Sequence, residues 1–282
     1  MLFKKIFSNI ILVLKFIRRS YELRIKLLPI DGKLPFKGKI SANGYYQYQL
    51  EQDIILSLLN LKKKRLDDKK RIFLCLSEQN ALEKIFNFIT PEIRSYLGAD
   101  SFLDGINWMV TDSSKSHDIL KQSNSISWHT DNVGSRLKLF LCIQGDGSQP
   151  TIVLPDKNRV PNYRRWLLNV LMESFRRFGI RNKINIYKSV AIKHYTGTAN
   201  IFDTQLLHRG KYERSKVSRI VLVFEFSNPH KHAITRGPIG TKNNHNSFIF
   251  NKNLLQIKNF KSILDPNRMH KKGNIFLYSE DI

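Results

Sequence analysis

Four side chains in the second half of the chain have the types and spacing of a metal-dependent reaction centre. His129 and Asp131 are two residues apart, His208 follows 77 residues after Asp131, and Arg219 lies eleven residues beyond His208. In an extended strand, residues i and i+2 point to the same face. His129 and Asp131 can therefore bind one metal ion from a single strand.

Two imidazoles and one carboxylate form a facial triad that suits ferrous iron, because it leaves coordination positions open for a chelating co-substrate and for dioxygen. Arginine binds carboxylates through two parallel charge-assisted hydrogen bonds, and Arg219 begins the apolar segment Ile220 to Phe226. A His-x-Asp pair alone is weak evidence in a chain with 8 histidines. The conjunction of all four residues with predicted strands favours catalysis.

The segments around these residues resemble the Fe(II)/2-oxoglutarate-dependent dioxygenases, and among them the phytanoyl-CoA dioxygenase-like branch. The resemblance covers roughly residues 95 to 228 and rests on three segments together with Arg219: Trp128 to Gly134, Arg136 to Leu141, and Phe202 to Gly210. It implies a mainly β fold with flanking helices around a double-stranded β-helix (jelly-roll, cupin-like) core.

The resemblance also implies the cofactors and the reaction. Iron(II) would be bound by His129, Asp131 and His208, and 2-oxoglutarate would chelate the iron while its distal carboxylate pairs with Arg219. In such enzymes, O2 decarboxylates the co-substrate to succinate, and a substrate C–H bond is usually hydroxylated. Related halogenases replace the carboxylate ligand with a small residue, so Asp131 favours hydroxylation.

One departure from the family pattern bears on the substrate. Many members of the branch continue into a Pro-Gly-Ser-His segment, whereas this chain reads Pro155-Asp156-Lys157-Asn158. A CoA thioester is therefore not carried over. The expected substrate is a small or carrier-linked metabolite, and the basic charge is compatible with an anionic one.

Several further residues each allow two interpretations. Lys138 and Thr151 lie on strands next to the site and would either assist co-substrate binding or simply extend from a barrel edge and pack. Trp128 is a pocket wall or, as we favour, a core residue. Asp203 either orients a ligand histidine or caps the next turn. The other histidines have no matching partners, and we expect them at the surface: His117, His194, His230, His232, His245 and His270.

Composition indicates one main domain in a reducing, cytoplasmic compartment. The chain has 282 residues, of which 41% are hydrophobic, enough for a substantial core. Cys75 and Cys142 lie far apart in apolar runs, so neither a disulfide framework nor a thiolate zinc site is predicted. The net charge of +24 would attract phosphorylated, carboxylated or membrane partners, although a biased composition explains it equally well.

The first 30 residues have the pattern of a basic amphipathic helix. Such a helix would lie on an anionic membrane surface or pack on the protein's own core, and the second reading is the more common one. The apolar run from Ile10 to Leu14 is far shorter than the ~20 residues of a membrane-spanning helix, and no small-residue cleavage site follows. We therefore expect neither a transmembrane segment nor a signal peptide.

We expect three regions: a helical N-terminal region (1–97) that packs on the core, a β core (98–228), and a C-terminal extension (229–282) that is a lid, a surface wrap or partly disordered. Helices are predicted from Tyr45 to Leu61, from Glu78 to Phe88 with a further turn after Thr90, and within the core from Tyr163 to Phe178. Strands are predicted at Phe102–Thr111, Ile126–Asp131, Leu137–Gln144, Thr151–Leu154, Val190–Tyr195, Ala199–Phe202 and Ile220–Phe226.

The sequence is compatible with two functions. The leading one is an Fe(II)- and 2-oxoglutarate-dependent hydroxylase. The alternative is a non-enzymatic β-barrel module that binds a polyanion, either nucleic acid or an acidic glycan. The basic residues are spread along the chain without the interleaved aromatic residues of a single-strand binding groove, so no specific nucleic acid is predicted.

Overall fold

The computed structural model describes residues 6–11, 13–15, 17–18, 21, 38–63, 71–99, 101–111, 126–131, 134–155, 167–168, 170–172, 174–175, 178, 186–211, 217–232, 247–251 and 276–279. The predictions for His117, His245, His270 and the segment after Pro155 lie outside these residues. The side chains of His230 and His232 also lie outside them.

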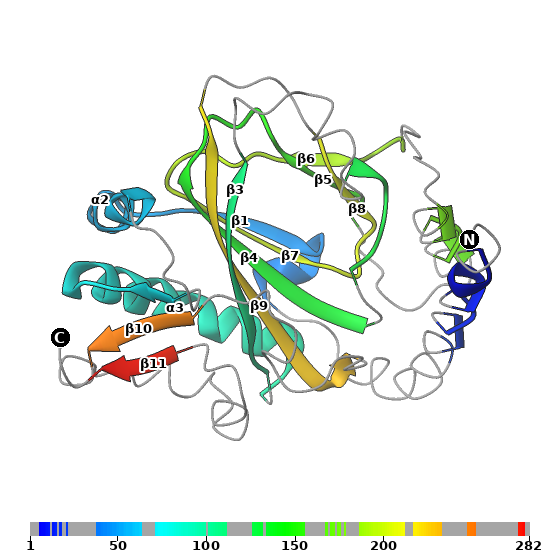
Figure 1. Ribbon diagram of the computed structural model, residues 1–282, viewed down its shortest axis with the longest axis horizontal. Coiled ribbons are helices and arrows are strands. Elements are labelled where there is room, and N and C mark those ends of the chain that lie inside the picture. Colours follow the sequence, from blue (N-terminus) through cyan, green and yellow to red (C-terminus); the bar gives the residue numbers. More distant parts are fainter. Residues whose placement is uncertain are drawn as a thin grey trace.

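A five-stranded antiparallel sheet forms the centre of the molecule (Figure 1). Its order is β1 (Tyr45–Gln49), β7 (Thr198–Asp203), β4 (Gly134–Gln144), β9 (Arg219–His232) and β3 (Phe102–Thr111). Alternation along β4 separates two faces. Leu137, Leu139 and Leu141 point into the main hydrophobic core, so the residues between them face the opposite side of the sheet.

A smaller sheet faces that opposite side. It consists of β6 (Val190–Ile192), β5 (Thr151–Val153) and β8 (His208–Gly210), all antiparallel. An isolated bridge between His129 and His208 adds the segment before β4 to its edge. From β3 to β9 the chain passes back and forth between the two sheets, which is the double-stranded β-helix expected from the sequence.

Two helices cover the outer face of the large sheet (Figure 1). They are α2 (Gln52–Leu59) and α3 (Leu76–Leu97), and α3 buries Ile85, Phe86 and Ile89 against the sheet. Phe86 meets Phe224 edge to face, with ring centroids 5.0 Å apart. The predicted break at Thr90-Pro91 is absent, since one continuous helix passes through Pro91.

The helix predicted from Tyr45 is wrong over its first residues, because Tyr45–Gln49 form strand β1 along β7. The residues Tyr46 and Tyr48 pack on the core side, which is the period-two pattern of a strand. Two short 3-10 turns flank this region, η1 (Lys39–Ala42) and η2 (Asn60–Lys63).

The outer face of the small sheet is covered by the helix inserted after β5. Its described residues, within 167–175, are helical, as the sequence predicts. Met172 packs with Trp128, Ile152 and Leu207. Trp128 is fully buried in this cluster and is a core residue.

The C-terminal extension contributes two strands. β10 (Ser247–Asn251) pairs in parallel with β11 (Phe276–Ser279) and with β2 (Arg71–Phe73), which precedes α3. The sequence had left the structure of this extension open. Among the described residues, no helix is long and apolar enough to span a bilayer.

Candidate metal centre

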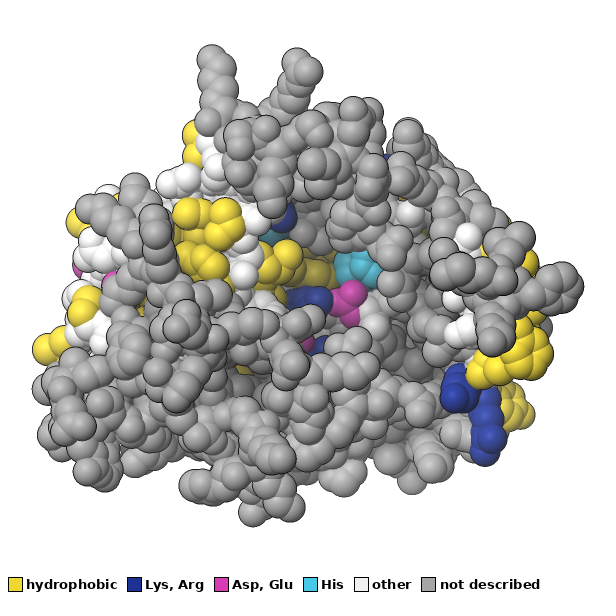
Figure 2. Space-filling model, viewed as in Figure 1, with side chains coloured by type: hydrophobic (Ala, Val, Ile, Leu, Met, Phe, Trp, Pro, Cys, Tyr) yellow, Lys and Arg dark blue, Asp and Glu magenta, His cyan; other side chains and the backbone are white. Residues whose placement is uncertain are grey.

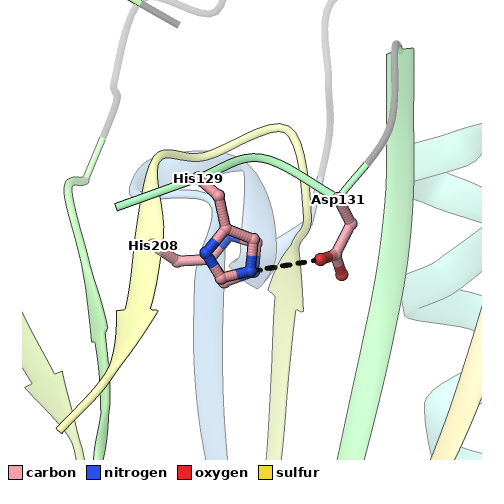
Figure 3. Close-up of side chains that lie close together, drawn as sticks. All are labelled: His129, Asp131 and His208. Carbon is pink, nitrogen blue, oxygen red and sulfur yellow. Dashed lines mark ion pairs between the residues drawn. The ribbon is translucent and has the colours of Figure 1, made fainter. Parts of the chain in front are cut away.

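The three predicted metal ligands converge between the two sheets (Figure 3). His129 and Asp131 come from the segment before β4, and His208 begins β8. The ligand atoms all lie within 4.8 Å of one another, and each histidine Nε2 is 3.5 Å from the Asp131 Oδ1. Figure 2 shows histidine, acidic and basic side chains together in a hollow of the surface.

Local backbone carbonyls orient both imidazoles. The Nδ1 of His129 lies 2.7 Å from the carbonyl oxygen of Ser127, and the Nδ1 of His208 lies 2.8 Å from that of Leu206. A carbonyl accepts only, so each Nδ1 carries the proton and each Nε2 presents a lone pair. Two backbone hydrogen bonds of 2.9 Å join His129 to His208 and fix their spacing.

The donor set fits a ferrous ion. Two imidazoles and a carboxylate are present, and burial together with the neighbouring His129 lowers the pKa of His208, which keeps it unprotonated. Burial opposes ionisation of Asp131, but the Lys138 ammonium group holds its pKa well below the usual value. His208 and Asp131 are therefore in the protonation states that a metal ion requires.

A buried ion-pair network surrounds the carboxylate ligand. Lys138 forms ion pairs with Asp131 and with Glu225, whose Oε1 lies 3.3 Å from the Lys138 Nζ. Glu225 also pairs with Arg136. Burial lowers the pKa of Lys138, but the two carboxylates outweigh this and raise it, so the lysine is charged. Lys138 thus holds the second oxygen of Asp131.

A second polar group lies deeper between the sheets. We call it the socket, and it consists of Gln149, Thr151, His194, Asn200 and Arg219. Val153 pairs with His208 and Thr151 pairs with Gly210, so Thr151 lies two residues, about 7 Å, further along the strand than the metal ligand.

Arg219 is the cation of the socket. Its guanidinium donates to the carbonyl oxygen of Gln149 at 2.6 Å and to the Thr111 hydroxyl at 3.3 Å. The buried Nε has no partner, and no described carboxylate forms an ion pair with this residue. Both side-chain polar atoms of Gln149 and the Oδ1 of Asn200 are likewise buried without partners. Such atoms are costly unless a ligand satisfies them.

A chain of hydrogen bonds orients the Thr151 hydroxyl. The Asn200 amide donates to the His194 Nδ1 at 3.1 Å, and the His194 Nε2 lies 2.9 Å from the Thr151 Oγ1. Burial and the nearby Arg219 lower the pKa of His194 to about 3, so the ring is neutral and its single proton is on Nε2. Thr151 therefore accepts from His194 and keeps its own proton for another acceptor.

A row of aromatic contacts runs from the socket to the metal ligands. The ring centroid of Phe140 lies 5.3 Å from that of His194 and 5.4 Å from that of Phe202, on which it stacks. The centroid of Phe202 lies 5.2 Å from that of His208.

Glycine permits a close approach at the end of β4, where a Cβ on Gly145 would lie 2.4 Å from the His194 carbonyl oxygen. The position of His194 thus depends on this glycine.

The structure brings together all six residues that the sequence singled out: His129, Asp131, Lys138, Thr151, His208 and Arg219. The prediction that His194 lies at the surface is wrong, because its exposed fraction is only 1%. Asp203 caps a turn, as one of its two readings had it, because it accepts from the backbone of Gln205 and from the Tyr96 hydroxyl. Gln149, Asn200 and Glu225 were not predicted.

No family model and no curated protein matches this chain. Among solved structures, the chain is similar to AviO1 from Streptomyces viridochromogenes Tue57, with 14% identity, a TM-score of 0.44, and coverage of 69% of this chain and 94% of that one. It is also similar to EctD from S. alaskensis with bound Fe, with 14% identity, a TM-score of 0.48, and coverage of 74% and 82%.

A third similar structure is the non-heme alpha ketoglutarate dependent epimerase SnoN from nogalamycin biosynthesis. It has 10% identity, a TM-score of 0.43, and coverage of 71% of this chain and 83% of that one. These identities and TM-scores are low.

Proposed function

We propose that this chain is an Fe(II)- and 2-oxoglutarate-dependent dioxygenase that hydroxylates a C–H bond of a small or carrier-linked, anionic metabolite. The observation that carries the proposal is the convergence of His129, Asp131 and His208 at one level of a double-stranded β-helix, with an unsatisfied polar socket about 7 Å deeper. A structural metal site would be closed by a fourth ligand.

Each protein group has a defined task in this proposal. His129, Asp131 and His208 hold Fe(II) through two nitrogens and one oxygen. Lys138 pairs with the Oδ2 of Asp131, and the Oδ1 faces the two imidazoles. Iron bound there would offer open positions at which dioxygen reacts with 2-oxoglutarate. The co-substrate and the substrate C–H bond would each supply two electrons, which yields succinate, carbon dioxide and a hydroxylated product.

The socket fits the distal carboxylate of 2-oxoglutarate. Arg219 offers a guanidinium with no acidic partner among the described residues, and Thr151 offers a hydroxyl proton whose direction His194 sets. A five-carbon diacid is long enough to reach from the metal ligands to this depth. The buried, unpartnered amide of Gln149 provides a further donor.

The charges around the site support an anionic substrate. The described ionic side chains of the metal centre and the socket comprise three cations, Arg136, Lys138 and Arg219, and two carboxylates, Asp131 and Glu225. Ferrous iron and the 2-oxoglutarate dianion cancel each other, so one positive charge is left over. A buried site with a surplus cation favours a ligand that carries a negative charge.

Turnover of 2-oxoglutarate without any added substrate tests this function. Purified protein supplied with ferrous iron, 2-oxoglutarate and oxygen should release succinate slowly, and His208→Ala should abolish the release. Asp146→Asn serves as the matched control, because Asp146 is exposed and accepts hydrogen bonds from Ser148 in a turn outside the metal centre and the socket. Equal succinate from the wild type and His208→Ala would refute the proposal, and a polyanion-binding module would release none.

A further inference from the structure

The N-terminal helix leaves its apolar face exposed. Its described residues lie within 6–21, and among those up to residue 14 five large hydrophobic side chains are at least 36% exposed, with Phe7 at 65% and Leu14 at 58%. At 100° per residue, these five residues fall within a sector of about 140°. They are Ile6, Phe7, Ile10, Ile11 and Leu14.

The side of this helix that faces the protein is a different and narrower row. Among the described residues of the helix, the partly buried ones are Asn9, Val13 and Ile17, which are spaced four residues apart. The sequence had favoured an amphipathic helix whose apolar face packs on the protein's own core. Most apolar side chains in the described part of the helix are exposed, so packing within the chain does not account for them.

A second exposed apolar surface lies on the helix inserted after β5. Its inner side belongs to the cluster around Trp128, while Leu167, Leu171 and Phe178 are between 42% and 50% exposed. In Figure 1 this green segment and the blue N-terminal helix lie at the same end of the molecule. Figure 2 shows hydrophobic and basic side chains together at that end.

Both segments are basic. The first 21 residues contain five lysines and arginines and no acidic residue, and residues 163–178 contain four arginines and one glutamate. Lys15 and Arg18 are exposed on the N-terminal helix. Such a charge opposes self-association of two copies through this face and attracts an anionic surface.

We propose that the N-terminal helix and the helix inserted after β5 dock this protein on an anionic lipid bilayer. The exposed apolar side chains enter the boundary between headgroups and acyl chains, and the basic side chains contact the headgroups. The N-terminal helix lies in the plane of the membrane surface. This proposal is independent of the reaction proposed above, because none of its residues belongs to the metal centre or the socket.

Co-sedimentation of the full chain with vesicles tests the proposal. Wild-type protein should pellet with vesicles of phosphatidylcholine and phosphatidylserine, and much less with phosphatidylcholine alone. Phe7→Ser/Ile11→Ser should lower the partition coefficient at least about tenfold, because two exposed apolar anchors are lost. Lys15→Gln/Arg18→Gln should weaken binding only to the anionic vesicles and reduce its dependence on salt.

The matched control is Leu56→Ser, which removes an equally exposed leucine (56%) from α2. It should pellet like the wild type, and circular dichroism should show that all variants are folded. Unchanged pelleting of Phe7→Ser/Ile11→Ser, or equal wild-type pelleting with neutral vesicles, would overturn the proposal. So would a lipid-free dimer in analytical ultracentrifugation that Phe7→Ser/Ile11→Ser converts to a monomer, because a second copy would then cover the face.

Discussion

Two histidines and one aspartate are prepared for a metal ion by groups only a few residues away. The carbonyls of Ser127 and Leu206 fix the tautomers of His129 and His208, and Lys138 on the following strand keeps Asp131 ionised. The site is therefore organised before a metal ion binds. Removing the carboxylate should lower the affinity for the metal ion, and not only the rate of turnover.

Asp131→Ala should weaken the binding of Fe(II) by at least about 100-fold, because one of three protein ligands is lost and Lys138 then faces the metal without its partner. Competition with a chelating dye under anaerobic conditions measures this affinity. Asp146→Asn should bind Fe(II) like the wild type. An Asp131→Ala variant with wild-type affinity would show that the metal is bound elsewhere.

Thr151→Val should lower the affinity for 2-oxoglutarate by about tenfold or more, since a hydrogen bond to a charged group is worth roughly 1.5–3 kcal/mol. Valine keeps the shape of threonine and removes only the hydroxyl that His194 orients. Calorimetric titration with 2-oxovalerate, which lacks the distal carboxylate, provides the control. The assignment fails if the variant loses affinity equally for both ligands.

His194 should make the protein less stable in mild acid. The pKa of His194 is about 3 in the folded protein and 6.5 in the unfolded chain. Below pH 6.5 the unfolded chain therefore binds a proton on this ring that the native state does not bind. This contribution is constant above pH 6.5, and it lowers the free energy of unfolding by about 2 kcal/mol between pH 7 and pH 5.

Urea unfolding of the wild type and His194→Gln at both pH values measures this contribution. The difference between the two proteins should change by about the same 2 kcal/mol between pH 7 and pH 5, with the wild type losing more stability in acid. If the free energy of unfolding depends on pH in the same way in both proteins, the His194 ring is not neutral in the native state.

At the scale of elements, helix α3 is tied to the turn that leads into the metal ligand His208. The Tyr96 hydroxyl donates to Asp203 Oδ2 at 2.6 Å in the fully buried space between α3 and β7. Tyr96→Phe should lower the free energy of unfolding by about 1–3 kcal/mol, because a buried carboxylate loses a donor. Phe88→Leu, on an exposed position of the same helix, is the control for urea unfolding. Equal stabilities of Tyr96→Phe and the wild type would contradict this.

The strands could largely be predicted from the sequence. β3 has the predicted bounds, Phe102–Thr111. β1 could not be recognised, because its partner β7 lies about 150 residues further along the chain and its tyrosines merge with the apolar pattern of α2. Pairing over such a separation leaves no local signal.

The metal ligands could be predicted from the two-residue spacing of His129 and Asp131. The strand predicted at Ile126–Asp131 is wrong, however, because this segment makes only an isolated bridge at His129. The socket could not be predicted as a whole, since its members come from four separate segments. Two signals were available in the sequence. Asn200 and Glu225 are polar residues in the middle of apolar strands, and His194 lies two residues after the buried Ile192 on the same face.

At the scale of the whole molecule, four layers surround the site. α2 and α3 cover the large sheet, and the inserted helix covers the small one (Figure 1). Separate hydrophobic clusters pack the helices against the two sheets. A small cluster of Val153, Ile192 and Phe202 joins the sheets beside the charged groups. This hydrophobic packing stabilises the barrel, although Arg219, Lys138 and Glu225 are buried in its interior.

The central claim is that Fe(II) and 2-oxoglutarate bind together at one site between the sheets. Anaerobic addition of both to the purified protein, followed by visible absorption, tests it most directly. The account predicts a weak charge-transfer band that needs both components and is missing in Asp131→Ala and His208→Ala. No band with the wild type, or the same band with both variants, would contradict it.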